Sequence, residues 1–245
     1  MKQSTVLLLG AKSDLAQSLA KTWAAKGNNI LLAARNIEEL EAQKKDLITR
    51  YNITVQTVVF DALAFDSHQS FYDALPLKPD ISICVFGYLG NQEQAENDSK
   101  EAFRIMNTNY SGVASILSVI ANDYCKKESG TIVGISSVAG ERGRQSNYFY
   151  GSAKAGMTAF LSGLRNRCYK KKVHIMTVKP GFMYTQMTEG MPLPKSLTAS
   201  PDKVAKYIYR ATLKQKNNIY VLPIWRLVMF IIRNIPEFIF KKLNL

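Results

Sequence analysis

The sequence predicts an α/β protein built as a single domain around a doubly wound, parallel seven-stranded sheet. Short apolar runs, many of them rich in β-branched residues, alternate with longer amphipathic stretches, the pattern of strands connected by helices. The first apolar run leads directly into a glycine turn and a helix start. The 245 residues, of which 47% are hydrophobic, suit one large domain better than two small ones. Right-handed crossovers place helices on both faces of such a sheet, in the Rossmann-type arrangement.

Seven short segments have the composition of buried strands. They are residues 4–10, 29–34, 53–60, 80–86, 130–136, 173–179 and 217–222. The amphipathic stretches that we interpret as helices lie near residues 14–26, 36–51, 67–75, 97–124, 149–171 and 201–215. The segment 182–200 contains Pro192 and Pro194 and is long for a connection between a strand and a helix, so we interpret it as a lid.

The composition limits the chemistry of the chain. Cys84, Cys125 and Cys168 are odd in number, lie far apart in the sequence and form no C-x-x-C pair. This argues against a disulfide framework or a zinc site and favours a reducing compartment. His68 and His174 are too few to form a metal site alone, so we expect structural roles for both and no metal. The N-terminal apolar run of about five residues is too short for a signal peptide, and no run reaches the roughly 18 apolar residues of a membrane-spanning helix.

The formal net charge of +13 favours anionic partners such as phosphates, nucleic acid or an acidic lipid surface. A generally basic proteome would give the same charge, so the charge alone does not separate these interpretations. Lys170, Lys171 and Lys172 form a short basic run at the end of a predicted helix, which is typical of a solvated face. We therefore expect no nucleic-acid partner.

The turn after the first strand has the features of a phosphate-binding site. Gly10 lies where the chain turns sharply and where a phosphate has to approach the backbone. The next helix begins near Ser13 and Asp14, either of which can cap it, and the free N–H groups of its first turn attract anions. We expect Gly10, Ser13, Asp14 and Leu15 to contact a dinucleotide cofactor. The three-glycine fingerprint itself is absent, because Asp14 and Ala16 occupy glycine positions.

Three further residues at strand ends support a nucleotide site. Ala34 stands where an acidic residue would bind a ribose 2′-hydroxyl, and Arg35 after it suits a 2′-phosphate, which favours NADP over NAD. A solvated arginine at a strand end is the alternative interpretation. Asp61 follows the third strand and is placed to bind an adenine amino group, and Gly87 after the fourth strand permits close approach of the cofactor.

The segment SSVAGERGRQSNYFYGSAK carries the strongest catalytic signal. Tyr150 and Lys154 are four residues apart, so on a helix they share one face. An ammonium beside a phenol stabilises the phenolate and lowers the tyrosine pKa, which makes a proton donor for a carbonyl that is being reduced. Ser137 precedes Tyr150 by thirteen residues at a strand end, where its hydroxyl can hold the substrate oxygen. This combination in an α/β chain predicts an oxidoreductase.

These residues resemble the short-chain dehydrogenase/reductase family over essentially residues 4–222. The resemblance implies catalytic roles for Ser137, Tyr150 and Lys154, and for Asn109 as the holder of a water in a proton relay. It also implies cofactor contacts from the residues that match the family motifs, namely Lys154, Pro180 of the Pro180-Gly181 pair and Thr185. The chain departs from the family in its glycine motif and in FGYLG, residues 86–90, where family members commonly have N-N-A-G.

Within the family, four segments look like the decaprenylphosphoryl-2-keto-ribose reductase branch. They are FDALAFDSH at 60–68, FGYLG at 86–90, the segment 136–156 and the tail at 225–243. That branch reduces the 2-keto sugar of a polyprenyl phosphate during the synthesis of a cell-wall arabinose donor. Arg35 favours NADP more than that branch requires.

The segment 223–245 is predicted as a tail of two amphipathic helices broken at Pro236, following a domain of residues 1–222. Its apolar residues alternate with four basic ones, Arg226, Arg233, Lys241 and Lys242. This composition suits a helix in a membrane interface, and it equally suits a tail folded against its own domain or a second subunit.

The sequence therefore predicts an NAD(P)H-dependent reductase of a keto group, with NADP as cofactor and NAD as the alternative. The expected substrate is the 2-keto sugar of a polyprenyl-phosphate-linked pentose, or else another hydrophobic ketone such as a steroid or acyl chain. A non-catalytic dinucleotide sensor is disfavoured, because it would have no need of the proton relay. We expect a homo-oligomer in the cytoplasm, with an anionic membrane surface as a further partner at the inner face of the cell membrane.

Overall fold

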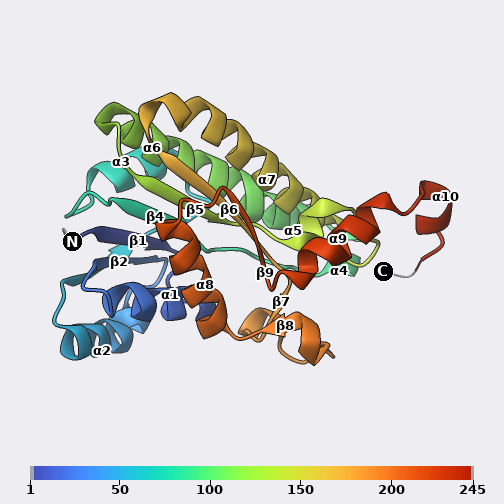
Figure 1. The fold of residues 1–245 in the computed structure, drawn as a ribbon, viewed down its shortest axis with the longest axis horizontal. Coiled ribbons are helices and arrows are strands. Elements are labelled where there is room, and N and C mark those ends of the chain that lie inside the picture. The colour runs from blue at the N-terminus through green and yellow to red at the C-terminus, as the bar shows by residue number, and fades with distance from the viewer. Residues whose placement is uncertain (1–2, 244–245) are drawn as a thin grey trace.

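The computed structural model describes residues 3–243, so residues 1–2 of the predicted domain and 244–245 of the predicted tail lie outside the described part of the chain. Seven parallel strands form one sheet in the order β3-β2-β1-β4-β5-β6-β9 (Figure 1). Their bounds are β1 Thr5–Leu9, β2 Asn29–Ala34, β3 Val55–Val59, β4 Ile81–Cys84, β5 Thr131–Ile135, β6 His174–Pro180 and β9 Asn218–Val221. The order reverses between β1 and β4, which is where doubly wound sheets bind their ligands. The predicted α/β fold is confirmed.

Helices cover both faces of the sheet. One face carries α1 (Asp14–Ala24), α2 (Glu41–Tyr51) and α8 (Pro201–Leu213), and the other carries α3 (His68–Asp73), α6 (Gly112–Lys127) and α7 (Tyr148–Cys168) (Figure 1). The short helices α4 (Gln92–Asn97) and α5 (Ser99–Met106) lie near the start of α7. The turn of residues 107–111 between α5 and α6 is a π-helix.

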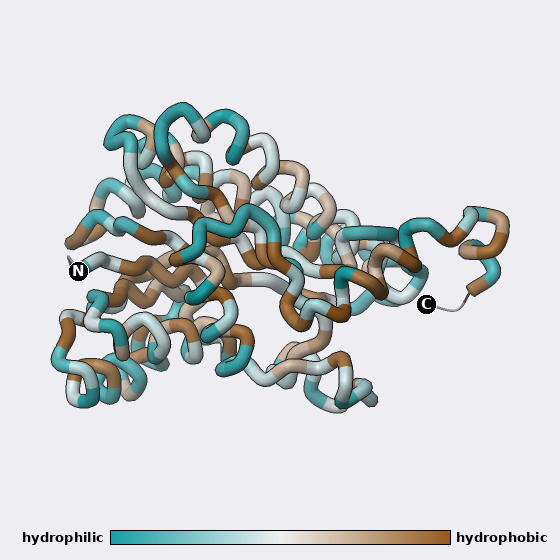
Figure 2. The backbone as a smooth tube through the Cα atoms, in the orientation of Figure 1, coloured by the Kyte–Doolittle hydropathy of each residue, from teal (hydrophilic) through white to brown (hydrophobic). Residues whose placement is uncertain are grey.

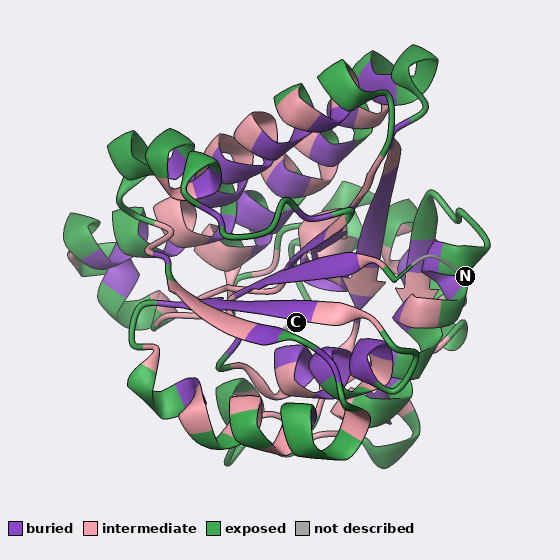
Figure 3. Cartoon of the chain, turned by 90° about the vertical axis from the view of Figure 1, so that its left-hand side faces the viewer, coloured by how far each residue is buried: buried purple, intermediate pink, exposed green. Residues whose placement is uncertain are grey.

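The sheet is buried because its central strands are apolar on both faces. All five residues of β1 are buried, and so are five of the six residues of β2. Figure 2 shows these strands as a hydrophobic centre, and Figure 3 shows them buried between helices whose outer faces are exposed. The side chains of β1 alternate between two cores, with Leu8 in the core under α1 and α8 and Leu7 in the core under α6 and α7.

The segment 182–200 has more regular structure than expected. Phe182–Met183 (β7) and Thr198–Ala199 (β8) pair as a small parallel sheet, and two 3₁₀ turns lie between them. Beyond β9, the chain forms α9 (Ile224–Asn234) and α10 (Glu237–Phe240), separated at Pro236 as predicted. Among the described residues, no helix combines the length and apolar character needed to cross a bilayer.

Packing brings together two cysteines that are far apart in the sequence. Cys125 on α6 and Cys168 on α7 are free thiols whose sulfur atoms are 3.2 Å apart.

Both histidines make hydrogen bonds within the fold. His68 is buried, with its ring nitrogens bonded to the Ser115 hydroxyl at 2.8 Å and the Asp61 carbonyl at 3.1 Å. His174 Nε2 bonds to the Lys216 carbonyl at 3.0 Å.

Candidate active site

A cavity of about 1110 Å³ opens at the carboxyl ends of the central strands. Its walls come from the turns that follow β1, β4, β5 and β6, from the start of α7 and from the segment 182–200. The predicted site residues that line it are Ser13, Asp14, Leu15, Gly87, Ser137, Tyr150, Lys154, Pro180 and Thr185. The cavity thus joins the predicted phosphate-binding turn to the predicted catalytic residues.

The turn after β1 has the local geometry of an anion site. Gly10 has φ +90°, and a β-carbon there would lie 2.7 Å from the Phe86 backbone nitrogen, so only glycine fits. Ser13 is the N-cap of α1, and its hydroxyl accepts the Ala16 N–H at 3.2 Å. The remaining N–H groups of the first turn are free to bind a diphosphate. The residues present therefore fit a dinucleotide.

Asp14 connects this turn to the segment 182–200. Its carboxylate accepts the Gln186 backbone N–H at 2.9 Å, across 172 positions of sequence. Thr185, just before, begins a 3₁₀ turn in a capping box with Thr188. Asp14 thus holds Thr185 and its neighbours over the cavity, a role that the sequence did not indicate.

Gly87, Asn109 and Lys154 converge from three separate elements. A β-carbon on Gly87 would lie 2.9 Å from Asn109 Oδ1 and 3.5 Å from Lys154 Nζ. Asn109 is fully buried in the π-helix, where its amide donates to the Tyr88 carbonyl at 2.6 Å and accepts the Tyr88 N–H at 3.2 Å. π-helical turns inside α-helices occur frequently at functional sites. Asn109 does not itself line the cavity but holds the backbone that does.

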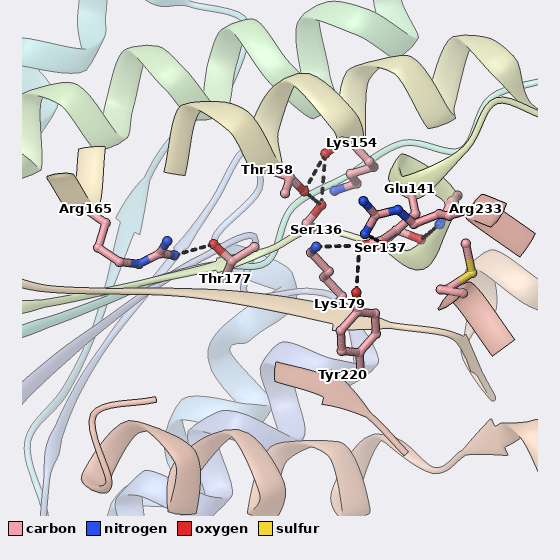
Figure 4. Close-up of polar contacts among 12 residues, drawn as sticks. Ser136, Ser137, Glu141, Lys154, Thr158, Arg165, Thr177, Lys179, Tyr220 and Arg233 are labelled. Atoms are coloured by element: carbon pink, nitrogen blue, oxygen red, sulfur yellow. Dashed lines mark hydrogen bonds and ion pairs between the residues drawn. The ribbon is translucent and has the colours of Figure 1, made fainter. Parts of the chain in front are cut away.

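The catalytic candidates come from β5 and α7. Ser137 follows β5, and Tyr150 and Lys154 lie one turn apart near the start of α7. Lys154 is 3% exposed, and its ammonium donates to the Ile135 carbonyl at 3.0 Å and lies 5.6 Å from the centre of the Tyr150 ring. Ser136 fixes α7 against β5, because its hydroxyl bonds to the Lys154 carbonyl at 3.0 Å and to Thr158 Oγ1 at 2.7 Å (Figure 4).

Burial dominates the ionisation of this pair. It raises the pKa of Tyr150 to about 12, while the Ser137 hydroxyl opposes the rise, and it lowers the pKa of Lys154 to about 8. The pKa of Tyr150 therefore lies above its usual value and not below it as expected, because the effect of burial is larger than that of the Ser137 hydrogen bond. Burial likewise disfavours the charged form of the Lys154 ammonium, which lies over the Tyr150 ring.

Arg35 and Asp61 lie outside the cavity, at the ends of β2 and β3. Arg35 is exposed and has no ionic partner among residues 3–243. Asp61 Oδ1 accepts the Leu63 N–H at 3.0 Å and caps the local turn. Lys12, which sequence reasoning passed over, pairs with Glu39 and joins the turn after β1 to the segment after β2.

The tail supplies a wall of the cavity. Trp225 of α9 is 4% exposed, lines the cavity and donates its indole N–H to the Leu197 carbonyl at 3.1 Å. Met229, one turn later, is also buried and packs with Trp225 and Val138. From the sequence alone, this segment suits a membrane interface and equally a tail folded against its own domain or a second subunit. The spacing of Trp225 and Met229 on one helical face is the signal for the packing observed here.

Glu141 and Arg142, which follow Ser137 in the sequence, connect the catalytic segment to the tail. Arg142 donates to the Ile232 and Ile235 carbonyls at 2.6 Å each and pairs with Glu237 at 2.9 Å. Glu141 is buried and binds Lys179, Tyr220 and Arg233, a network that Figure 4 shows between β6, β9 and α9. Lys179 precedes Pro180 of the cavity wall, so the network positions that wall as well.

The sequence and the fold both match known proteins. The pattern of the short chain dehydrogenase family matches residues 4–194. An uncharacterized oxidoreductase of Mycobacterium tuberculosis is 34% identical over 241 residues, covering 97% of this chain and 96% of that protein. Among solved structures, a short-chain dehydrogenase from Sphingobium yanoikuyae in complex with NADPH has a TM-score of 0.82 at 17% identity, covering 96% and 97% of the two chains. A 7β-hydroxysteroid dehydrogenase has a TM-score of 0.86 at 15% identity, covering 98% and 96%.

Proposed function

Because this chain belongs to the short-chain dehydrogenase family of NAD(P)-dependent oxidoreductases, we propose that it reduces the 2-keto sugar of a polyprenyl-phosphate-linked pentose. One observation carries the proposal. Helix α9 lines the cavity with Trp225 on one face and exposes Leu227 and Phe230, 56% and 66% exposed, on another. A cavity that contains polar catalytic groups, beside an exposed apolar surface, suits a substrate with a sugar head and a lipid tail.

NADP(H) is the proposed cofactor. Its diphosphate would bind at Gly10, Ser13 and Leu15, and its ribose 2′-phosphate would meet Arg35. Contacts from the remaining cofactor candidates would complete the site, namely Asp14, Asp61, Gly87, Lys154, Pro180 and Thr185. The similar folds solved with NADPH or NADP support this choice. When bound, the cofactor supplies the hydride that the reduction needs.

Residues of the chain would supply the proton that the keto oxygen receives. Ser137 would donate a hydrogen bond to the keto oxygen and orient it, and Tyr150 would transfer its phenolic proton to that oxygen. A pKa of about 12 keeps Tyr150 protonated at neutral pH, as a donor has to be. Lys154 would bind the nicotinamide ribose. Asn109 would act through the Gly87–Tyr88 backbone to hold a water of the proton relay.

The outer face of the tail is proposed to bind an anionic membrane surface. Leu227, Phe230 and Ile231 on α9 and Phe238 and Ile239 on α10 are exposed. Of the four basic residues predicted to face lipid, Arg233 pairs with Glu141, while no ion pair involves Arg226, Lys241 or Lys242 among the described residues. Exposed apolar groups flanked by basic ones suit the interface of an acidic bilayer.

A second candidate function is the reduction of another hydrophobic ketone. The cavity is lined by Leu89, Phe182, Met187 and Met191 as well as by polar groups, which suits a steroid or an acyl chain. The likeness in fold to a 7β-hydroxysteroid dehydrogenase agrees with this alternative.

The two candidates are separated by the oxidation of NADPH in the presence of a panel of ketones. The panel contains a polyprenyl-phosphoryl 2-keto-pentose, the same sugar without the lipid phosphate, a ketosteroid and a 3-ketoacyl thioester, each with and without detergent. We expect the highest kcat/KM for the lipid-linked sugar. A higher value for the steroid or the thioester would contradict the proposal, and the Tyr150→Phe variant controls for turnover that does not come from the enzyme.

A further inference from the structure

We propose that Arg144 forms an anion subsite in the cavity that binds the phosphate group of the substrate; this rests on the proposed function for the identity of the phosphate. Arg144 lies between Ser137 and Tyr150 in the sequence and lines the same cavity as both. Its guanidinium lies beside Met229, which packs with Val138, the residue after Ser137. Arg144 is thus on the wall next to Ser137, whereas the cofactor diphosphate is expected at the Ser13 end.

The guanidinium of Arg144 is partly buried and has few protein partners. Its Nε atom is buried and has no hydrogen-bond partner, and no carboxylate of the described residues pairs with it. Its one hydrogen bond runs from Nη2 to Met229 Sδ at 3.8 Å, and a thioether is a weak acceptor. Burial lowers the pKa of Arg144, since nothing beside it favours the charge. An unpaired buried charge is costly unless a ligand completes it.

Arg142, two residues earlier, is an arginine of the same segment that has a structural role. Its guanidinium donates to three carbonyls, pairs with Glu237 and stacks on the Phe240 ring at 3.6 Å. Arg144, by comparison, has one weak hydrogen bond and no ionic partner among the described residues. The difference indicates that Arg142 holds the fold and that Arg144 is free to bind a ligand.

The surroundings of Arg144 favour an anion over a neutral group. Asn147, on the same wall, has a buried Oδ1 without a partner, and a half-turn of its amide would present an N–H donor. The carboxylates that line the cavity lie on other elements. Asp14 is bonded to Gln186, and Glu93 and Glu96 are exposed on α4. An arginine fork matches two phosphate oxygens at once.

The position of the subsite matches the chemistry of the proposed substrate. In a pentose with a phosphate on C1 and a keto group on C2, the anion is attached one carbon away from the carbon that is reduced. A phosphate held by Arg144 would then fix the keto oxygen near Ser137 and Tyr150. The lipid on the other side of the phosphodiester would leave along the wall that contains Trp225 and α9.

The test compares two ketones that differ only in the phosphate, a short-chain prenyl-phosphoryl 2-keto-pentose and the neutral glycoside of the same prenol and keto sugar. In Arg144→Gln, the ratio of kcat/KM for the phosphorylated over the neutral ketone should fall roughly 10- to 100-fold, the range for a lost charged hydrogen bond. Arg144→Lys should recover part of the ratio, because it restores the charge without the fork. The control Arg210→Gln, an exposed arginine on α8, should leave the ratio unchanged.

A second measurement separates this proposal from the proposed function. At saturating NADPH, inorganic phosphate should compete with the neutral ketone in the natural enzyme, with an inhibition constant that rises about tenfold or more in Arg144→Gln. If phosphate competes but the sugar is not reduced, the subsite stands and the proposed function fails. If the sugar is reduced and neither the ratio nor the phosphate inhibition changes in Arg144→Gln, the subsite is overturned. A lower melting temperature for Arg144→Gln, with equal losses on both ketones, would assign Arg144 to structure and overturn it as well.

Discussion

The indole of Trp225 lies directly against Gly181 and leaves no room for a β-carbon there. Gly181 follows β6 in the cavity wall, and Trp225 belongs to a helix that begins 43 positions later in the chain. The residue pair thus connects the cavity wall after β6 to the tail, and substitutions that change the size of the two side chains test the contact.

Gly181→Ala should destabilise the protein and reduce turnover, because the added methyl group displaces Trp225. Trp225→Ala should cost about 3–5 kcal/mol of unfolding free energy through the loss of a buried aromatic side chain. The double variant should be more stable than the sum of the two losses predicts, since the space emptied by one change accepts the methyl group of the other. Urea unfolding of the four proteins measures the coupling, and simple additivity would contradict the contact.

Tyr150→Phe should fold and bind NADPH normally while losing turnover by roughly 10²- to 10⁴-fold, the usual contribution of a general acid. The change removes only the phenolic oxygen, whereas the ring packing with Ala95 and Ile105 is retained. Cofactor fluorescence measures binding and single-turnover kinetics measures the chemical step. Tyr148→Phe, an exposed neighbour on the same helix, is the matched control. Near-normal turnover in Tyr150→Phe would assign the proton to another group.

Arg35→Ala should lower the preference for NADPH over NADH by about 1–3 kcal/mol, the scale of a charge-assisted contact with a phosphate. Arg35 is exposed and has no ionic partner among the described residues, so its removal disturbs little else. Dissociation constants for the two cofactors give the preference directly. Arg50→Ala, an arginine that pairs with Asp46 on α2, serves as control. Equal affinity of the natural protein for both cofactors would rule out this role.

Replacing Lys154 should change how stability depends on pH. The pKa of Lys154 falls from 10.5 to about 8 on folding, so between these values the unfolded chain holds a proton that the native chain has released. The stability of the natural protein therefore rises with pH through this window, relative to a variant without the amine. Lys154→Met should be more stable by about 3 kcal/mol below pH 8, with the advantage vanishing near pH 10.5. Urea midpoints of the two proteins at several pH values measure the difference, and a constant difference would contradict the burial of a charged lysine.

Serine substitutions at Leu227, Phe230 and Ile231 should weaken binding to anionic vesicles at least tenfold, since each removes apolar surface from the proposed interface. Added salt should weaken binding further, because it screens the basic residues. Vesicle sedimentation measures both effects, with Leu213→Ser as an exposed apolar control on α8. Truncation after Leu222 would be a poor test, since it also removes Trp225 from the cavity wall. If the triple variant binds vesicles unchanged but alters the oligomeric state, the face contacts a second subunit instead.

Much of the fold could be predicted because its signals are local. The run Asn29–Ala34 is apolar from its second residue onward and forms β2 with those bounds, and Pro236 separates α9 from α10 as expected. The strands β7 and β8 escaped prediction because two residues each carry no usable periodicity. Helix α4 is similarly short and lies in a segment that pattern reasoning left without structure.

The catalytic residues could be predicted because they belong to one sequence motif. The contacts that depend on packing between distant segments could not. Ser137, Tyr150 and Lys154 lie close in the sequence and come together in one cavity wall. The role of Trp225 depends on a contact with Gly181 across the molecule, and that of Asp14 on a bond to Gln186. The pKa of Tyr150 depends on burial, which spacing along a helix does not reveal.

The two faces of α9 have a consequence for how the enzyme would meet a water-insoluble substrate. A helix with its side chains is only about 10–12 Å thick. If the outer face of α9 rests on a bilayer, the reacting cavity behind Trp225 lies about one helix diameter from the headgroups. A sugar on a lipid phosphate would reach Tyr150 without its hydrocarbon chain leaving the membrane. Because the hydrocarbon chain would not enter the protein, its length should not affect the reaction. Substrates with short and long polyprenyl groups should be reduced equally well once both are in a bilayer.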